Sequence, residues 1–180
     1  MFEHVGACVN AANCSVPATD TTPGTCNGDG NGAIATTSES FRGWQQLQLA
    51  KLIDGNFTGT GASAVIGTNV PRSRITNAGW SLWNTALESN VNWYTPDLNN
   101  LLMFGAPATI DAVTLTAGAV ITATEAWQVD KKIDDSLPTT GRTMALKATT
   151  SIAPNCVSGA AYNITDLSVS CSLMMSLTLK

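Results

Sequence analysis

The last part of the chain carries the clearest alternation of apolar and polar residues. In residues 167–179 every odd position is Leu, Val, Met or Cys, whereas the even positions are mostly Ser or Thr. Because successive side chains of a β-strand point to opposite faces, this pattern predicts one long strand whose odd face is buried. We therefore expect a charge at Leu173 or Leu177 to unfold the domain.

Four shorter segments also have the pattern of strands. They are residues 80–83, 100–104, 113–121 and 143–149. The third has the most regular alternation, with apolar residues at odd positions separated by Thr and Gly, which is typical of a strand with one buried face.

Two segments begin with the residues of a capping box, in which a Thr hydroxyl and a Glu side chain each bond the other's backbone N–H group. Thr36 and Glu39 open the first, and apolar residues follow at near-helical spacing, which predicts a helix over about 38–54. Thr122 and Glu125 open the second, which predicts a helix that ends before the next proline.

The pattern weakens toward the start of the chain. Residues 1–35 are rich in Cys, Gly and Asn and have no apolar periodicity, so we expect a long loop there and a helix and sheet core in residues 36–180. Helices and strands alternate without a repeated βαβ unit. The sequence therefore predicts one α+β domain over 1–180, with an antiparallel β-sheet, packed helices and long loops.

Charge is sparse in this composition. Charged residues make up 12% of the 180 residues, and the formal net charge is -4. The few Lys and Arg residues are scattered, which is unlike the basic surface of a nucleic-acid-binding protein, and no apolar run approaches the roughly 20 residues that cross a bilayer. Composition thus favours an exported protein with no nucleic-acid partner.

The five cysteines have neither CxxC spacing nor neighbouring histidines, which favours disulfides over a zinc site. Cys156 and Cys171 enclose the last loop, so we expect them to be bonded. One further pair is expected among Cys8, Cys14 and Cys26, and the sequence leaves open which two residues form it.

The residue types in the sequence give little support for a catalytic function. The one histidine, His4, lies in the N-terminal loop, away from any obvious nucleophile. Asp130, Asp134 and Asp135 offer paired carboxylates, but two lysines interrupt them, which is typical of a solvated helix face. We therefore expect a protein without enzymatic activity.

One loop has the oxygen spacing of a calcium site. Asn27, Asp29 and Asn31 stand at positions 1, 3 and 5 of such a loop, a glycine stands at position 6, and Ala33 offers its carbonyl at position 7. Position 12 is a serine, and the acidic Glu39 falls one residue late. Calcium is accordingly the one cofactor that the sequence suggests, and the alternative is a Gly/Asn turn with positive φ angles.

Three segments resemble bacterial type IV pilin-like proteins, the class with a prepilin-type cleavage and methylation signal that includes the pseudopilins of type II secretion. They are residues 26–34 (CNGDGNGAI), 40–55 (SFRGWQQLQLAKLIDG) and 125–138 (EAWQVDKKIDDSLP). Residues 69–80 and the loop between the two late cysteines fit the same pattern, so the resemblance covers about residues 24 to 180.

This resemblance implies a filament subunit that performs no chemistry. Members begin with a hydrophobic helix that anchors the precursor in the inner membrane and later packs in the filament core. Here that helix would precede residue 1 or be supplied by a separate chain, and the odd face of residues 167–179 is where we expect it to bind. The implied partners are copies of the chain or sister pilins, at the cell surface for a pilus or in the periplasm for a pseudopilus.

An alternative function is a surface binding module, such as a minor or tip pilin that recognises a ligand through exposed loops. Trp83, Trp93 and Tyr94 are the aromatic residues that would serve it, although aromatic residues are more often part of the core.

Overall fold

The structure of the chain is a computed structural model, which describes residues 31–34, 37–84, 99–110, 112–146 and 155–177. Within these ranges the chain forms helices and antiparallel strands, which confirms the α+β class. In chain order the elements are α1 (Thr37–Leu49), β1 (Gly79–Asn84), β2 (Asn100–Ile110), β3 (Val113–Gly118), β4 (Ile121–Thr122), α2 (Ala123–Ile133), β5 (Thr143–Ala145), β6 (Val157–Ser158), β7 (Ala161–Tyr162), β8 (Val169–Cys171) and β9 (Leu173–Ser176).

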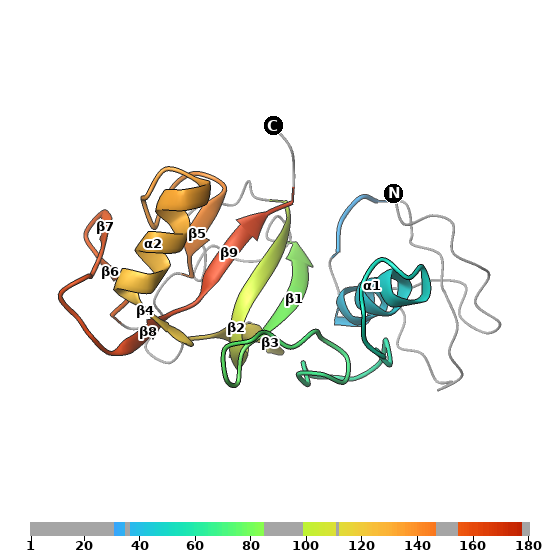
Figure 1. Cartoon of the computed structure of the whole chain (residues 1–180). Coiled ribbons are helices and arrows are strands. Elements are labelled where there is room, and N and C mark those ends of the chain that lie inside the picture. Colours follow the sequence, from blue (N-terminus) through green and yellow to red (C-terminus); the bar gives the residue numbers. More distant parts are fainter. Residues whose placement is uncertain (1–30, 35–36, 85–98, 111, 147–154, 178–180) are drawn as a thin grey trace.

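The main sheet has the strand order β1-β2-β9-β5 (Figure 1). Strand β2 is long enough to serve two pairings. Its first half lies between β1 and β9, and its second half pairs with β3, with a shift of register between Ala106 and Pro107. The short pairs β4-β8 and β6-β7 complete the described strands.

One side of the main sheet carries a closed apolar core. Trp83 lies opposite Leu101, and Met103 lies opposite Met174, so these side chains share that side. The cluster also includes Ile110, Leu115, Ala117, Met144 and Leu146, and all its members are at most 2% exposed. Burial of this kind contributes about 25 cal/mol per Å² of apolar surface.

Both helices lie against the opposite side of the sheet. On it Trp80, Phe104, Leu173 and Ala145 form a row across four strands. Helix α2 packs at the β5 end of this row through alanines, which are small enough for close approach, whereas α1 packs at the β1 end. Figure 1 shows strands β9 and β2 between the helices, with no helix in front of them.

The prediction of one long strand over 167–179 is wrong in two respects. The segment forms two strands, because the chain leaves its pairing with β4 at Cys171 and joins β2 and β5 from Leu173. The odd positions are not uniformly buried either, since Leu167 is 84% exposed and Leu177 is 48% exposed. A charge at Leu177 should therefore not unfold the domain.

The even positions of this segment are buried in its middle. Met174 and Ser172 are fully buried, and the Ser172 hydroxyl donates to the carbonyl of Ala117 at 2.7 Å. A serine can occupy such a position because it finds an acceptor inside the protein. Alternation of polarity could not reveal this partner, which is distant in the sequence.

Other predicted elements are confirmed with altered limits. The segment 113–121 divides into β3 and β4, and 143–149 begins as β5, with residues 147–149 outside the described residues. Helix α2 has the predicted capping box of Thr122 and Glu125. For α1, Thr36 lies outside the described residues.

Helix α1 ends at Leu49, earlier than the predicted residue 54. Lys51 has a φ of 58°, the Leu52 N–H donates to the Leu47 carbonyl, and the Lys51 N–H donates to that of Gln48. This is a Schellman ending in which Lys51 takes the left-handed position usually filled by glycine. The sequence gives no sign of it, because the nearest glycine comes four residues later.

Candidate functional site

The three aspartates of the α2 segment form the solvated face that the sequence predicted only in part, since Asp135 is exposed but the other two are not. Asp130 is fully buried, and Asp134 is half-buried. The alternation of Asp and Lys gave the wrong prediction for Asp130, because the side of α2 that carries this residue faces the segment between β6 and β8 rather than solvent. The lysines that interrupt the pattern, Lys131 and Lys132, are exposed.

Asp130 connects α2 to that segment. One carboxylate oxygen accepts a hydrogen bond from the Tyr162 hydroxyl at 2.8 Å, and the other accepts one from the Ser136 N–H at 3.2 Å. Burial raises the pKa of Asp130 above its ordinary value, and these two hydrogen bonds partly oppose the shift. Burial also raises the pKa of Tyr162, and the hydrogen bond to Asp130 raises it further.

Asp134 closes the free edge of the sheet. The outer N–H groups of β5 belong to Thr143 and Ala145; the first donates to Asp134 Oδ2 at 2.8 Å and the second to the Pro138 carbonyl at 2.9 Å. The Arg142 N–H also donates to Asp134. With its N–H groups satisfied, β5 presents fewer free donors to a strand of another molecule.

Asp135 shapes the same loop. Its carboxylate accepts from the Leu137 N–H at 2.8 Å and from the Thr140 hydroxyl at 2.7 Å. Gly141 then has a φ of 80°, and a Cβ there would collide with the Asp134 carboxylate. All three aspartates thus have hydrogen-bonding partners that organise residues 134–143.

The disulfide between Cys156 and Cys171 is confirmed. The two Cα atoms are 4.9 Å apart, and both residues are fully buried. The bond closes the segment that carries β6 and β7, in which Tyr162 reaches Asp130. The disulfide and this hydrogen bond therefore hold the same loop against α2. Cys8, Cys14 and Cys26 lie outside the described residues, so their pairing stays a prediction.

The aspartate cluster also has the spacing of metal ligands. One oxygen from each of Asp130, Asp134 and Asp135 can be chosen so that all three lie within 4.8 Å of one another. Hard cations such as Ca²⁺ take carboxylate ligands of this kind. The hydrogen bonds described above already account for the arrangement without an ion, so we assign the cluster a structural role.

The calcium loop predicted near the N-terminus is described only in part. Asn27 and Asp29 lie outside the described residues. Asn31 Oδ1 accepts from the Ala33 N–H at 2.7 Å, and Glu39 lies in α1, where it is 8% exposed. Calcium binding here stays a prediction.

Residues 31–34 form a turn that is attached to the sheet through Asn100 at the start of β2. Asn100 Oδ1 accepts from the Ile34 N–H and from the Asn84 side chain, and Asn100 Nδ2 donates to the Gly32 carbonyl. Gly32 has a φ of 74°. A glycine with positive φ fits both a calcium loop and a Gly/Asn turn, so the two alternatives stay as predicted.

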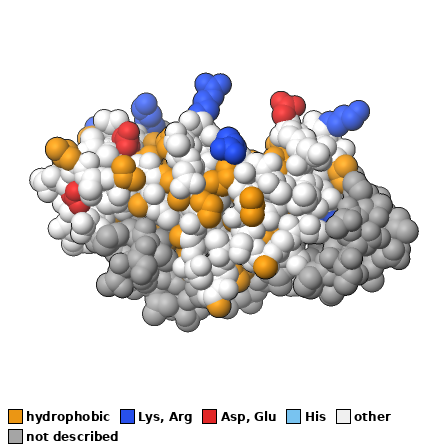
Figure 2. All heavy atoms as spheres, turned by 90° about the horizontal axis from the view of Figure 1, so that it is seen from below, with side chains coloured by type: hydrophobic (Ala, Val, Ile, Leu, Met, Phe, Trp, Pro, Cys, Tyr) orange, Lys and Arg blue, Asp and Glu red, His pale blue; other side chains and the backbone are white. Residues whose placement is uncertain are grey.

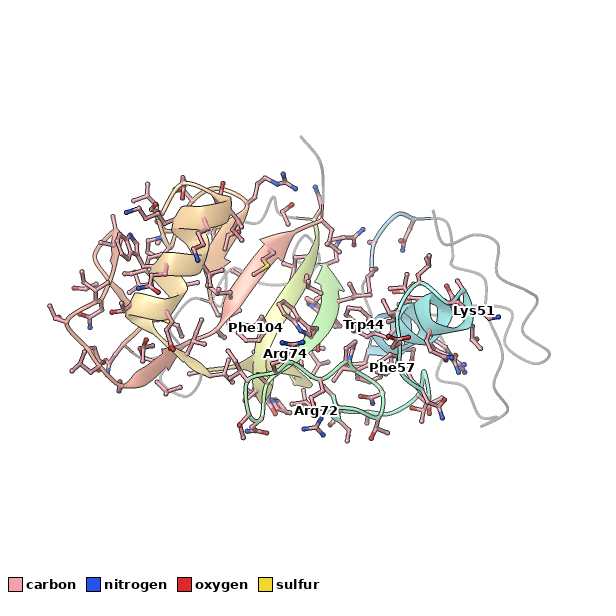
Figure 3. All side chains as sticks on the ribbon, viewed as in Figure 1. Trp44, Lys51, Phe57, Arg72, Arg74 and Phe104 are labelled. Atoms are coloured by element: carbon pink, nitrogen blue, oxygen red, sulfur yellow. A yellow bond between two sulfur atoms is a disulfide. The ribbon has the colours of Figure 1, made fainter. Side chains whose placement is uncertain are left out.

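An apolar strip lies on the sheet between the two helices. We define it as Trp80, Leu102, Phe104, Met175 and Leu177. Leu102 and Met175 are neighbours across β2 and β9, and each is half-buried, as is Trp80. Phe104 lies against Trp80 with ring centroids 4.7 Å apart, and Figure 3 shows Phe104 on the sheet beside the loop that carries Arg74.

Sequence reasoning found this strip only in part. Met175 and Leu177 belong to the odd face that was expected to bind a helix, whereas Trp80 and Leu102 were placed on strands without a stated role. The signal that was overlooked is that the segments 80–83 and 100–104 are apolar at nearly every position, which is typical of strands covered on both faces.

The remaining candidate residues give little support to a ligand site. Trp83 is 2% exposed in the core, so it is not available to bind a ligand. His4, Trp93 and Tyr94 lie outside the described residues.

Comparison with known proteins found no matching family model, no matching curated protein and no matching solved structure. Within the described ranges, neither helix has the length and apolar character needed to cross a membrane.

Proposed function

We propose that the chain is the globular head of a type IV pilin-like filament subunit, a pilin or a pseudopilin, and that it performs no chemistry. In this proposal the apolar strip binds a hydrophobic helix that is either joined to the head in a longer precursor or supplied by a separate chain. The filament lies at the cell surface or, for a pseudopilin, in the periplasm.

The observation that carries the proposal is the incomplete cover of one side of the sheet. Helix α1 buries Leu82 at one end of a row across the strands, and the α2 loop buries Thr143 at the other end. Between these two, Leu102 and Met175 are only partly buried. An apolar helix laid on them would complete the layer, as helices in grooves do in other complexes.

The polar groups near the strip and the helices support a non-catalytic role. The described carboxylates at the end of α2 accept hydrogen bonds from backbone and hydroxyl groups, and the disulfide is buried. Each of these groups therefore has an evident function in holding loops, which agrees with a head whose purpose is to be stable and to assemble.

The strip can be tested in cells that assemble the filament. Leu102→Lys and Met175→Lys, each introduced into the precursor, should lower the amount of the chain in filaments sheared from the cells by about tenfold or more, because each lysine would be buried without a partner under the helix. Since both side chains are only partly buried in the head alone, the purified heads should stay folded.

Two further variants serve as controls. Leu52→Lys places the same charge on a side chain that is 71% exposed beyond the end of α1, and it should assemble normally. Leu173→Lys places it at a position that is 1% exposed, and it should unfold the head. Normal assembly of both strip variants would contradict the proposal, as would an equal loss in the Leu52 control.

A further inference from the structure

Charge is distributed unevenly over the described surface. Figure 2 shows a face on which Lys, Arg, Asp and Glu lie along one margin, while apolar and uncharged polar atoms fill the middle. In a chain with so few charges, the places where charges of one sign stand alone are informative. Among the described residues, the segments 55–84 and 155–177 each carry charges of one sign only, and their signs are opposite.

The first segment contains the basic loop, which we define as residues 71–78. Arg72 and Arg74 are the only charged residues in the segment from 55 to 84, and both are exposed. Hydrogen bonds hold the loop in place, because the Ser73 N–H donates to the Ala78 carbonyl and the Ile75 N–H donates to the Ser73 hydroxyl. Ile75 within the loop is 41% exposed.

The second segment contributes most of the acidic patch, which we define as Glu125, Ile164, Asp166, Leu167 and Val169. Asp166 is the only charged residue in the segment from 155 to 177, and its three apolar neighbours in the patch are at least 50% exposed. Glu125 caps α2 at Thr122, which pairs with Val169 across β4 and β8, so it adds a second negative charge nearby.

The acidic patch is also held in a fixed shape. Asp166 accepts from the Ser168 N–H at 2.8 Å, and its own N–H donates to the Asn163 carbonyl. Hydrogen bonds from Ser168 lower the pKa of Asp166. Both surfaces therefore carry charges on loops whose backbone is held by hydrogen bonds, next to exposed aliphatic side chains.

We propose that the basic loop of one copy binds the acidic patch of the next copy. Two positive charges then face two negative ones, and Ile75 meets the exposed aliphatic residues of the patch. Because the two surfaces lie on different parts of the molecule, the contact is heterologous and leaves each copy with a free surface at either end. Such a contact repeats along a row of subunits, and as a filament contact it rests on the function proposed above.

The contact can be measured on the purified chain by analytical ultracentrifugation at high protein concentration. The chain should associate at about 20 mM salt and less at about 500 mM, because salt screens exposed charges. The double variant Arg72→Glu with Arg74→Glu should lower the association constant by about tenfold or more, and so should Asp166→Lys with Leu167→Lys. Melting temperatures would verify that both variants are folded.

Mixing the two variants gives the decisive observation. Each variant has two surfaces of like charge and should not self-associate, but the negative patch of the first matches the intact basic loop of the second. The altered surfaces are complementary as well, so the mixture should associate about as well as the wild type. Association of either variant alone at the wild-type level, or no gain on mixing, would overturn the contact.

The same variants separate this proposal from the filament function. If wild-type filaments contain the chain and the two charge variants enter them normally, the contact is wrong and the function stands. If filaments do not contain the chain but the mixture still associates, the function is wrong and the contact stands. Should the first charge variant fold differently, Arg74→Gln with Arg72→Gln provides a milder change with the same expected direction.

Discussion

The two helices flank the same side of the sheet but are held there in different ways. Helix α1 is buried over eight consecutive residues, from Glu39 to Gln46, so nearly its whole circumference is covered. Helix α2 is buried only at Ala123, Ala126 and Asp130, along one stripe. Helix α1 is therefore buried within the core, whereas α2 packs on the core along one stripe and exposes its other faces.

The polar contacts at the two ends differ in kind. Near α1, neutral amides organise the loop that follows the helix: Gln45 Nε2 donates to the Thr58 carbonyl, and Asn69 bonds the backbone of Thr60, Ser63 and Val65. Near α2, carboxylates and a disulfide do this. Packing and amide hydrogen bonds should therefore dominate at the α1 end, where the buried Arg42 guanidinium also donates to Gln45 Oε1 at 2.7 Å, whereas carboxylates and a covalent bond dominate at the α2 end.

The two ends should differ most in the loss of unfolding free energy when one apolar side chain is truncated at each end. Phe41 is fully buried in α1, so Phe41→Ala should lower the free energy of unfolding by about 3–5 kcal/mol. Val129 on α2 is 37% exposed, and Val129→Ala should cost less than about 1 kcal/mol. Urea denaturation would measure both, and equal costs would remove the distinction between a core helix and a surface helix.

Loss of the disulfide should have the next largest effect, confined to the α2 end. Replacing Cys156 and Cys171 by Ala removes a link between residues 15 apart, and should lower stability by about 3 kcal/mol in the loop-entropy estimate. Hydrogen exchange should rise in α2 and β7 before it rises in α1. Uniform exchange across both ends would show that the bond stabilises the whole domain instead.

Removal of a buried amide should weaken the α1 end by an intermediate amount. Asn69 is 2% exposed and makes hydrogen bonds to three backbone groups. Asn69→Ala leaves these groups without their partner and should cost about 2 kcal/mol. The loss should be equal at acidic and neutral pH, because no charge changes; a pH-dependent loss would contradict the assignment of neutral contacts to Asn69.

Exposing the edge of β5 should increase association between molecules more than it lowers the stability of the domain. Asp134→Ala frees the Thr143 N–H and should cost about 1 kcal/mol, while exposing a donor to a strand of another molecule. Light scattering at rising concentration should detect more aggregation than for the wild type. Asp134→Asn keeps an acceptor oxygen and is the matched control; equal aggregation of both variants would argue against edge protection.

The smallest effect should be the pH dependence contributed by Asp130. Its pKa is raised on folding from the ordinary 3.8, so its stabilising contribution is complete below that value and is lost as pH rises through the folded-state pKa. Asp130→Asn cannot ionise, and its amide can still accept from Ser136 and donate to the Tyr162 oxygen. The stability of this variant relative to wild type should therefore rise from about pH 3 to about pH 7, and a fall would contradict the burial of the charge.

What could be predicted from the sequence divides by the range of the interaction rather than by the end of the sheet. The start of α2 and the disulfide were predicted correctly, because a capping box is encoded within four residues and the two late cysteines bracket one loop. The buried polar face of α1, the role of Asp130 and the turn at Lys51 were not predicted. Each depends on a partner distant in the chain or on a backbone angle that the residue type does not favour.

The apolar strip was predicted only in part. Its residues have the polarity of core residues, yet in the structure all of them except Phe104 are partly or largely exposed. No local sequence pattern distinguishes a covered apolar residue from a partly exposed one. The difference becomes visible only when the register places Leu102 beside Met175, between the ends occupied by α1 and the α2 loop.

The most direct test of the central claim is mass spectrometry of filaments sheared from the native cell surface, directed at this chain and at whatever precedes its first residue. The account predicts that the chain is abundant there, either continuous with a methylated hydrophobic helix or accompanied by that helix as a separate chain. Filaments that lack the chain would contradict its role as a subunit of a surface pilus.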